Sequence, residues 1–170
     1  MTAGTHHHPL NVWPRGGSLN GMDIHSKSPY PAGELSNFYP HPFIHDGEEC
    51  ASMEGLLQSL KYSDPIAAAN VRKLHGGSAK EAGELSGYMK GNAPLWWKGH
   101  PIDRHGVEYK EFITEAFDSL STSESFREAL EATGDEALTH EVGNADPHET
   151  ILTADEFVGQ LNRLRSKLFN

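Results

Sequence analysis

Cysteine is almost absent from this chain, since Cys50 is the single one among 170 residues. One cysteine excludes an intrachain disulfide and a zinc site built from several thiolates. Basic residues are also scarce: 14 Lys and Arg stand against 24 Asp and Glu, which gives a formal net charge of −10. This charge argues against broad affinity for nucleic acid, because such binding needs cations that displace counterions from phosphates. Recognition of one modified nucleotide in a local pocket stays open.

Long apolar runs and a signal-peptide pattern are absent as well. We therefore expect no contact with a membrane, and we expect the chain in the cytoplasm of a cell or of a virus-infected cell. The hydrophobic content of 36%, with 15 aromatic side chains, is typical of a folded protein. Residues 1–21 are rich in His, Pro and Gly and show no periodicity, so we predict an N-terminal extension over 1–21 and one domain over 22–170.

Histidine is plentiful, at eleven residues, yet the sequence predicts neither a metal site nor a cofactor. The run His6-His7-His8 has nothing nearby that completes a ligand set, and no HExxH motif or comparable cluster is present. Cys50 is not expected to act as a nucleophile. It follows two acidic residues at the end of an extended stretch, and such neighbours raise the pKa of a thiol.

Helical periodicity and capping residues dominate the chain from residue 52 onward. We predict the following helices, with their capping residues in parentheses: Met53 to Tyr62 (Ser52), Ile66 to Leu74 (Asp64 and Pro65), Ala79 to Met89 (Ser78), Asp103 to Leu120 with Val107 inward, Glu124 to Ala132 (Ser123), and a terminal helix to Leu168 after a capping box from Thr153 to Glu156.

Few and short strands are expected. Met22 to His25 is predicted to pair antiparallel with Phe43 to Cys50, where Asp46-Gly47 makes a turn. Leu138 to Val142 is another candidate strand. Asn92 to Pro101 is predicted to be a loop that carries two adjacent tryptophans. The expected fold class is α+β, predominantly α-helical, in one compact domain.

The stretch from residue 33 to 61 carries the strongest pattern for function. Leu35-Ser36-Asn37-Phe38-Tyr39-Pro40 combines a hydroxyl, a carboxamide and two aromatic rings, which suits a flat polar ligand. In the helix that follows, Glu54, Gln58 and Lys61 share one face within roughly 10 Å. Its apolar stripe is made by Met53, Leu56, Leu57 and Leu60. The alternative interpretation of the polar face is that it only contacts solvent.

These residues resemble, in order and spacing, the signature of the NADAR family, which is associated with NAD and ADP-ribose metabolism. The matches are Leu35 to Pro40, Phe43, Asp46-Gly47, Ser52, Glu54, Gln58 and Lys61. Further on, Ala79-Lys80 with Gly83, then Trp97, Thr133-Gly134, and Glu141 with Asp146 follow family patterns, so the resemblance spans about 33–165. Two departures stand out. Gly55 replaces the usual His, and Pro147 to Thr150 follow Asp146 where the family has Trp-Gly.

The resemblance implies a NADAR-like fold and an N-glycosidase, a hydrolase that cleaves the bond between a ribose and a base. The implied substrates are a small nucleotide or ADP-ribosyl molecule, a riboflavin-pathway intermediate, or a modified base in nucleic acid. The implied catalytic residues are Glu54, the key carboxylate and expected general base for the attacking water, and Asp146, which positions water or holds a ribose hydroxyl. The implied substrate-binding residues are Ser36, Asn37, Phe38, Tyr39, Gln58, Lys61, Lys80 and Trp97. For Lys80 a solvated position, and for Trp97 plain core packing, stay open as alternatives.

Three other functions are weighed against this one. The first is a module that binds ADP-ribose or a related nucleotide without cutting it, prompted by the two departures. The second is a His-dependent metalloenzyme, for which the sequence offers no ligand cluster. The third is a protein-interaction role, in which the aromatic loop is a partner surface. The identity of the leaving group and the oligomeric state are not determined by the sequence.

Overall fold

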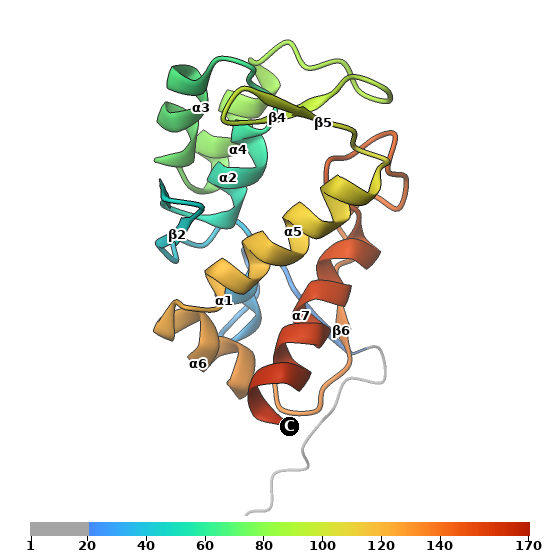
Figure 1. Cartoon of the computed structure of the whole chain (residues 1–170). Helices are drawn as coiled ribbons and strands as arrows, with labels where there is room; N and C mark the ends of the chain where they lie inside the picture. The colour runs from blue at the N-terminus through green and yellow to red at the C-terminus, as the bar shows by residue number, and fades with distance from the viewer. Residues whose placement is uncertain (1–20) are drawn as a thin grey trace, which may run out of the picture.

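The computed structural model describes residues 21–170 and has an α+β fold that is mainly helical, which confirms the predicted class (Figure 1). The described residues form seven helices: α1 (Ala32–Leu35), α2 (Met53–Ser59), α3 (Pro65–Arg72), α4 (Gly76–Glu84), α5 (Val107–Leu120), α6 (Glu124–Ala132) and α7 (Ala154–Phe169). They also form six short strands: β1 (Met22–Asp23), β2 (Phe43–His45), β3 (Glu48–Cys50), β4 (Leu95–Trp97), β5 (His100–Ile102) and β6 (Leu138–Thr139). The predicted extension, apart from Gly21, and the run His6-His7-His8 lie outside the described residues.

Four of the predicted helix starts are confirmed by the capping contacts. The side chains of Ser52, Asp64 and Ser123 each accept a hydrogen bond from a backbone N–H in the first turn of α2, α3 and α6. Thr153 and Glu156 form the complete capping box of α7. These contacts satisfy N–H groups that have no partner inside the helix, and all of them join residues no more than three positions apart.

Two of the predicted helices have wrong boundaries. The helix assigned to Ala79–Met89 begins earlier, at Gly76, and ends at Glu84, because the backbone N–H of Gly76 binds the carbonyl of Phe38 and fixes the start. Helix α5 begins at Val107 and not at Asp103, since β5 continues to Ile102. Val107, predicted to face inward, is 69% exposed in this first turn.

For the predicted strands, the turn is confirmed and the partner of the first strand is wrong. β2 and β3 form an antiparallel hairpin whose turn is Asp46-Gly47, with φ of 48° and 77°, as predicted. The predicted partner of this hairpin, Met22–His25, is wrong: β1 pairs in parallel with β6, Met22 beside Leu138. Parallel pairing needs a long crossover connection, and here it joins segments more than a hundred residues apart, which no local pattern indicates.

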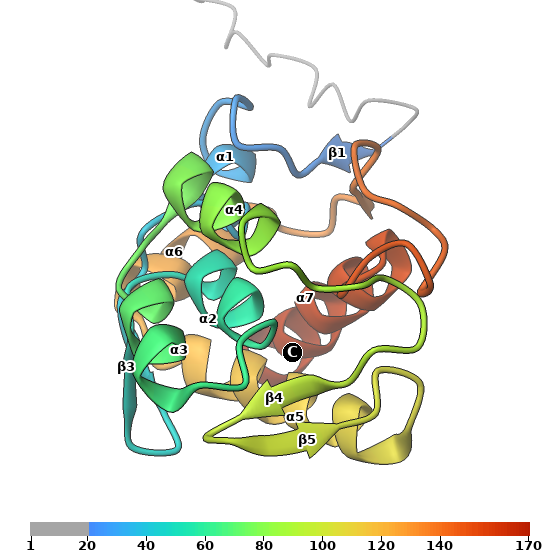
Figure 2. The same ribbon diagram turned by 90° about the horizontal axis from the view of Figure 1, so that it is seen from above.

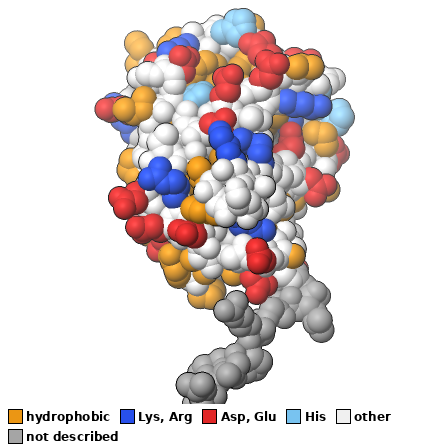
Figure 3. Space-filling model, turned by 60° about the horizontal axis from the view of Figure 1, so that its bottom comes forward, with side chains coloured by type: hydrophobic (Ala, Val, Ile, Leu, Met, Phe, Trp, Pro, Cys, Tyr) orange, Lys and Arg blue, Asp and Glu red, His pale blue; other side chains and the backbone are white. Residues whose placement is uncertain are grey.

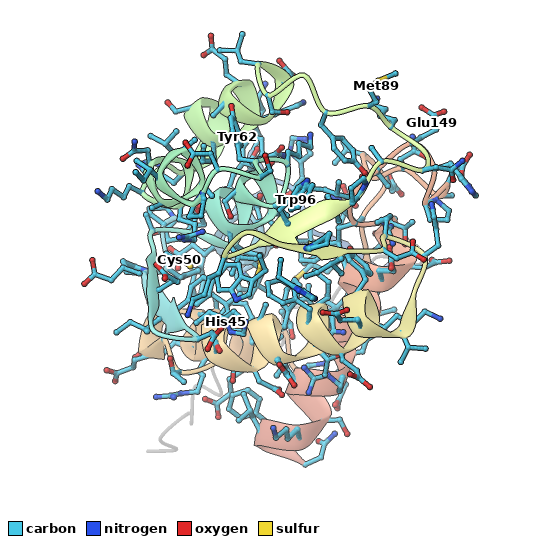
Figure 4. The ribbon with its side chains drawn as sticks, turned by 45° about the horizontal axis from the view of Figure 1, so that its top comes forward. His45, Cys50, Tyr62, Met89, Trp96 and Glu149 are labelled. Carbon is cyan, nitrogen blue, oxygen red and sulfur yellow. The ribbon has the colours of Figure 1, made fainter. Side chains whose placement is uncertain are left out.

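The stretch predicted as a loop with two tryptophans is the hairpin β4–β5, closed by Lys98 and Gly99 at φ of 50° and 79°. Successive side chains of a strand point to opposite faces. Trp97 is therefore buried, with its ring 5.1 Å from that of Phe112, whereas Trp96 on the other face of β4 is half-buried (Figure 4).

The helices form two groups around one continuous apolar core. Helix α2 packs against α3 and α4, and α5 packs against α7, as the two perpendicular ribbon views show (Figures 1 and 2). The core joins α2 to α5, α6 and α7 through buried side chains that include Leu56, Leu60, Phe117, Phe126, Phe157 and Leu161. Leu168 is 36% exposed, because it lies in the last turn of α7.

None of the helices among residues 21–170 is long and apolar enough to cross a membrane. On the face that Figure 3 shows, acidic and basic side chains of the described residues are interspersed.

Candidate functional site

The Ser36–Phe38 turn connects the starts of two helices. The carbonyl of Asn37 accepts the backbone N–H of Glu54, at 2.9 Å, in the first turn of α2. The carbonyl of Phe38 accepts the N–H of Gly76, at 3.1 Å, at the start of α4. The Ser36 hydroxyl accepts the N–H of Phe38 and so closes the turn itself. The backbone of this motif thus fixes where α2 and α4 begin relative to each other.

Two adjoining cavities lie beside this turn, with volumes of about 430 Å³ and 190 Å³. They share the wall residues Gln58, Lys80, Glu149, Thr150 and Ile151. The larger cavity is also lined by His25, Ser26, Ser36, Asn37, Phe38, Glu54, Leu57, His140, Val142, Gly143, Asn144, Leu152 and Phe157. The smaller cavity is also lined by Lys61, Glu84, Tyr88, Lys90, Gly91, Pro147 and His148. Seven of the ten residues predicted from the sequence therefore meet in one cleft.

Glu54 is the acidic centre of the larger cavity. Its side chain is only 9% exposed, and its Oε1 accepts a hydrogen bond from Nε2 of Gln58 at 2.8 Å. Burial raises the pKa of Glu54, against the opposing effects of the Gln58 hydrogen bond and the positive charges of Lys61 and Lys80. Glu54 lies in the first turn of α2, where the helix dipole favours the ionised form, and burial acts in the opposite direction.

The raised pKa of Glu54 predicts a pH-dependent effect on stability. A carboxyl whose folded-state pKa lies above its ordinary value of 4.5 stabilises the fold at low pH, and this contribution is lost as the pH rises through the folded-state pKa. Glu54→Gln is neutral at every pH. We therefore expect it to raise the melting temperature more at pH 8 than at pH 4. Thermal denaturation at the two pH values checks this, and an equal change at both would contradict it.

Gln58 is held between Glu54 and α4. Its Oε1 is buried and has no hydrogen-bond partner among residues 21–170. A Cβ placed on Gly83 would lie 1.7 Å from that oxygen and 2.5 Å from Cδ. Gly83 therefore supplies the space that the Gln58 carboxamide occupies, and this gives a physical reason for the glycine of the Ala79-Lys80…Gly83 pattern.

Positive charge gathers at the smaller cavity. Lys61, Lys80 and Lys90 all line it, together with the carboxylates of Glu84 and Glu149. Burial lowers the pKa of Lys61. Nζ of Lys61 lies 5.7 Å from the centre of the Tyr88 ring. Nζ of Lys90 and a carboxylate oxygen of Glu149 lie 4.0 Å apart at this cavity. In a chain of net charge −10, this local excess of cations favours an anionic ligand group.

The buried Arg104 holds the backbone of the wall that the two cavities share, and no sequence pattern singled it out. Nε of Arg104 donates to the carbonyl of Thr150 at 3.1 Å, and its guanidinium binds both carboxylate oxygens of Glu156. The Tyr109 hydroxyl donates to the next carbonyl, that of Ile151. The backbone of this wall is therefore held by Arg104, which precedes α5, and by Tyr109 of α5, while Glu156 of α7 holds Arg104 in place.

Two histidines of the larger cavity were also missed, because the signal for them is tertiary. The parallel pair β1–β6 ends at the cleft, so the residues that follow the two strands both enter its wall. His25 follows β1 and His140 follows β6. Nδ1 of His140 lies 2.7 Å from the carbonyl oxygen of Ile24.

Three predicted site residues do not line either cavity. Tyr39 is 37% exposed and packs on His41, with 4.7 Å between ring centres. Trp97 is 8% exposed, and its Nε1 donates to Asp46, in line with the alternative of core packing. Asp146 is exposed and accepts the backbone N–H of His148, which holds the pKa of Asp146 below its ordinary value. The following residues, Pro147 and His148, do reach the smaller cavity.

Gly55, which replaces the family's usual His, has a packing reason. A Cβ there would lie 2.5 Å from the carbonyl oxygen of Leu74 and 3.0 Å from that of Arg72. The position faces the end of α3 and not the cleft, so its glycine allows the two helices to approach closely. The departure at Gly55 removes no side chain from the cavity wall.

Within residues 21–170, no three His, Cys, Asp or Glu side chains are placed so that they share one metal ion. Cys50 is buried in β3, and burial raises the pKa of its thiol to about 12. The thiol is therefore protonated at neutral pH, as expected from the sequence. Desolvation contributes more to this shift than the acidic neighbour Glu48.

Comparison with known proteins gives a sequence family and a fold. The model of the family of bacteriophage protein GP30.3 matches residues 29–166. A 17.1 kDa protein from the Gp30–rIII intergenic region of Enterobacteria phage T4 is 32% identical over 152 residues, which cover 88% of this chain and 100% of the relative. Among solved structures, the NMR structure of the Escherichia coli protein YbiA matches with a TM-score of 0.57 and 20% identity, over 86% of this chain and 83% of YbiA. The likeness to YbiA is one of fold.

Proposed function

The chain belongs to the family of bacteriophage protein GP30.3, and from its cleft and its fold we propose that it is an N-glycosidase. The fold neighbour YbiA is a NADAR-family protein, and that family is thought to hydrolyse N-glycosidic bonds. The proposed substrate is a ribose phosphate or ADP-ribose joined through C1′ to a nitrogenous base. The proposed place of the reaction is the cytoplasm. Because the T4 relative is a phage protein, we propose that this is the cytoplasm of an infected cell.

The observation that carries this proposal is the placement of Glu54. Glu54 is the buried carboxyl of the larger cavity, whose wall also has amide, hydroxyl, imidazole and apolar side chains, with Lys80 and the exposed Glu149. The adjoining cavity is lined by three lysines and two glutamates. A ligand with an anionic group in the smaller cavity and a ribose in the larger one would bring C1′ towards Glu54. No comparable buried acid lines the outer pocket beside the β2–β3 hairpin.

The chemistry needs a carboxylate at this point. Breaking a bond between C1′ and nitrogen builds positive charge on the ribose, as in other glycoside hydrolyses. A fixed negative charge in a poorly solvated site stabilises that charge more strongly than it would in water. Burial raises the pKa of Glu54, and the positive charges of Lys61 and Lys80 favour its ionised form.

The other wall residues have matching roles in this proposal. The Asn37 carboxamide both donates and accepts, which suits a ribose hydroxyl or a base edge. Phe38 supplies an aromatic face for a planar base, a contact worth about 1–3 kcal/mol per base in single-strand binders. Lys61 and Lys80 bind phosphate. Gln58 orients Glu54. The role of Asp146 stays a prediction, because Pro147 and His148 line the cleft but Asp146 does not.

A substrate panel read by mass spectrometry tests the proposal. The panel holds DNA with ADP-ribosyl-guanine, a ribosylaminouracil phosphate, NAD and free ADP-ribose. We expect the wild-type chain to release a base from at least one of the first three and to leave free ADP-ribose unchanged. Absence of release from every member would remove the N-glycosidase proposal.

A non-catalytic nucleotide-binding module is the second candidate. The observation in its favour is that Pro147 and His148, from the stretch where the family's Trp-Gly is absent, line the smaller cavity, so this wall differs from that of the family. Calorimetric titration with ADP-ribose separates the two functions. Binding without base release from any panel member identifies the module.

A further inference from the structure

We propose that His140 is a second catalytic residue of this cleft and accepts the proton of the attacking water. This inference rests on the proposed N-glycosidase function and deepens it. His140 lines the same cavity as Glu54 but comes from a different part of the chain, directly after β6, and nothing in the sequence pattern singled it out.

The tautomer of His140 is fixed by its backbone partner. Nδ1 lies 2.7 Å from the carbonyl oxygen of Ile24, and a carbonyl only accepts, so Nδ1 carries the proton and donates it. In the neutral ring Nε2 then has a free lone pair. An Nδ1–H bond to a backbone carbonyl is a common way in which proteins present the other nitrogen of a histidine as a base or ligand. Nε2 has no hydrogen-bond partner among residues 21–170.

The ring of His140 is also held in place sterically. It packs edge-on against Phe157, with 4.9 Å between ring centres and 77° between planes. The chain also turns close to the ring at Gly143, where a Cβ would lie 2.5 Å from Cδ2 of His140. A base held in this way has few alternative orientations, which is the condition for efficient proton transfer.

His25, on the same wall, has the opposite arrangement. Its Nδ1 accepts the backbone N–H of Lys27 at 3.0 Å, so in the neutral ring the proton is on Nε2. Neutral His25 therefore has no lone pair left for water. This difference is the reason why the structure assigns the role to His140 and not to His25.

The proposed reaction is a hydrolysis at C1′. The C1′–N bond breaks, and its electron pair leaves with the base, which takes a proton from solvent. The oxygen of a water molecule bonds to C1′, and a proton of that water passes to Nε2 of His140. His140 later returns the proton to solvent. Glu54 stabilises the positive charge on the ribose during this exchange, so the two side chains have separate tasks.

The test uses His140→Asn. The amide nitrogen of Asn takes roughly the place of Nδ1 and keeps the contact with Ile24, but it offers nothing at the place of Nε2. We expect kcat to fall about 10²-fold, a usual loss for a general base, with the melting temperature within about 2 °C. Azide bonds to C1′ without losing a proton, so we expect it to restore base release to within about tenfold and to give a ribosyl azide by mass spectrometry.

The control is His100→Asn, which changes an exposed histidine paired with Glu108 and is expected to behave as wild type. Wild-type turnover by His140→Asn would overturn the inference while the proposed function stands. A loss that azide does not restore, or one that comes with a lower melting temperature, would assign His140 a structural role and also overturn it. Absence of base release by the wild-type chain would remove the proposed function and this inference together.

Discussion

Glu54→Gln is expected to lower base release by at least about 10³-fold, the largest effect of any single change in the cleft. The amide keeps the shape of the side chain and an oxygen that can accept from Gln58, now 2.8 Å from Glu54. It removes only the negative charge that stabilises the ribose in the transition state. Turnover of the substrate identified by the panel, followed by mass spectrometry, measures the loss.

The fold and the affinity for ligand separate this effect from damage to the chain. We expect Glu54→Gln to bind ADP-ribose within about threefold of wild type, because the lost charge acts mainly on the transition state. A loss of ground-state binding would instead raise KM and leave kcat unchanged. Glu81→Gln removes an exposed carboxylate from α4, outside both cavities, and is the matched control. Retention of full turnover by Glu54→Gln would remove Glu54 from the mechanism.

Gly83→Ala is expected to lower turnover by about 10²-fold or more while leaving the fold as stable as before. The new methyl group would lie 1.7 Å from Oε1 of Gln58, so the flexible carboxamide must leave its place. Glu54 then loses its hydrogen bond, and small displacements of a catalytic group cost about this much. Because Gly83 has ordinary helical φ, alanine suits the backbone and contributes about 0.5–1 kcal/mol of helix propensity.

Two comparisons test whether Gly83 acts through Gln58. Gly77→Ala is in the same helix, with no atom within 4 Å of the added carbon, and is expected to keep full turnover. Gln58→Ala removes the group that Gly83 accommodates. We therefore expect the double variant Gln58→Ala/Gly83→Ala to be no slower than Gln58→Ala alone, as for residues that act as one unit. Additive losses would instead point to a general role of Gly83 in helix packing.

Much of the helical framework is predictable from the sequence, because its signals are local. Ser52, Ser123 and the Thr153–Glu156 box bind backbone groups within three residues, so their spacing alone marks the helix starts. The same holds for the turn Asp46-Gly47, whose positive φ values are typical of these residue types. The start of α4 was misplaced because it is fixed by Phe38, which is distant in sequence.

Half of the candidate site is likewise encoded locally. Glu54 and Gln58 share a helix face because they are four residues apart, and their hydrogen bond follows from that spacing. The Ser36–Phe38 turn was singled out by its residue types, and its three residues line the larger cavity. The burial of Trp97 is not encoded locally. A strand presents its side chains to alternate faces, and packing against Phe112 decides that Trp97 lies inside.

By itself, then, the sequence determined the fold class, most helix starts and the polar face that carries Glu54, since these depend on hydrogen bonds and periodicity within a few residues. The tertiary structure decided what surrounds that face. The parallel pairing of β1 with β6 brings His25 and His140 to the cleft, and the approach of α4 makes Gly83 the space for Gln58. Burial also sets the direction of the Glu54 pKa, because desolvation depends on every element packed around the carboxyl and not on its own helix.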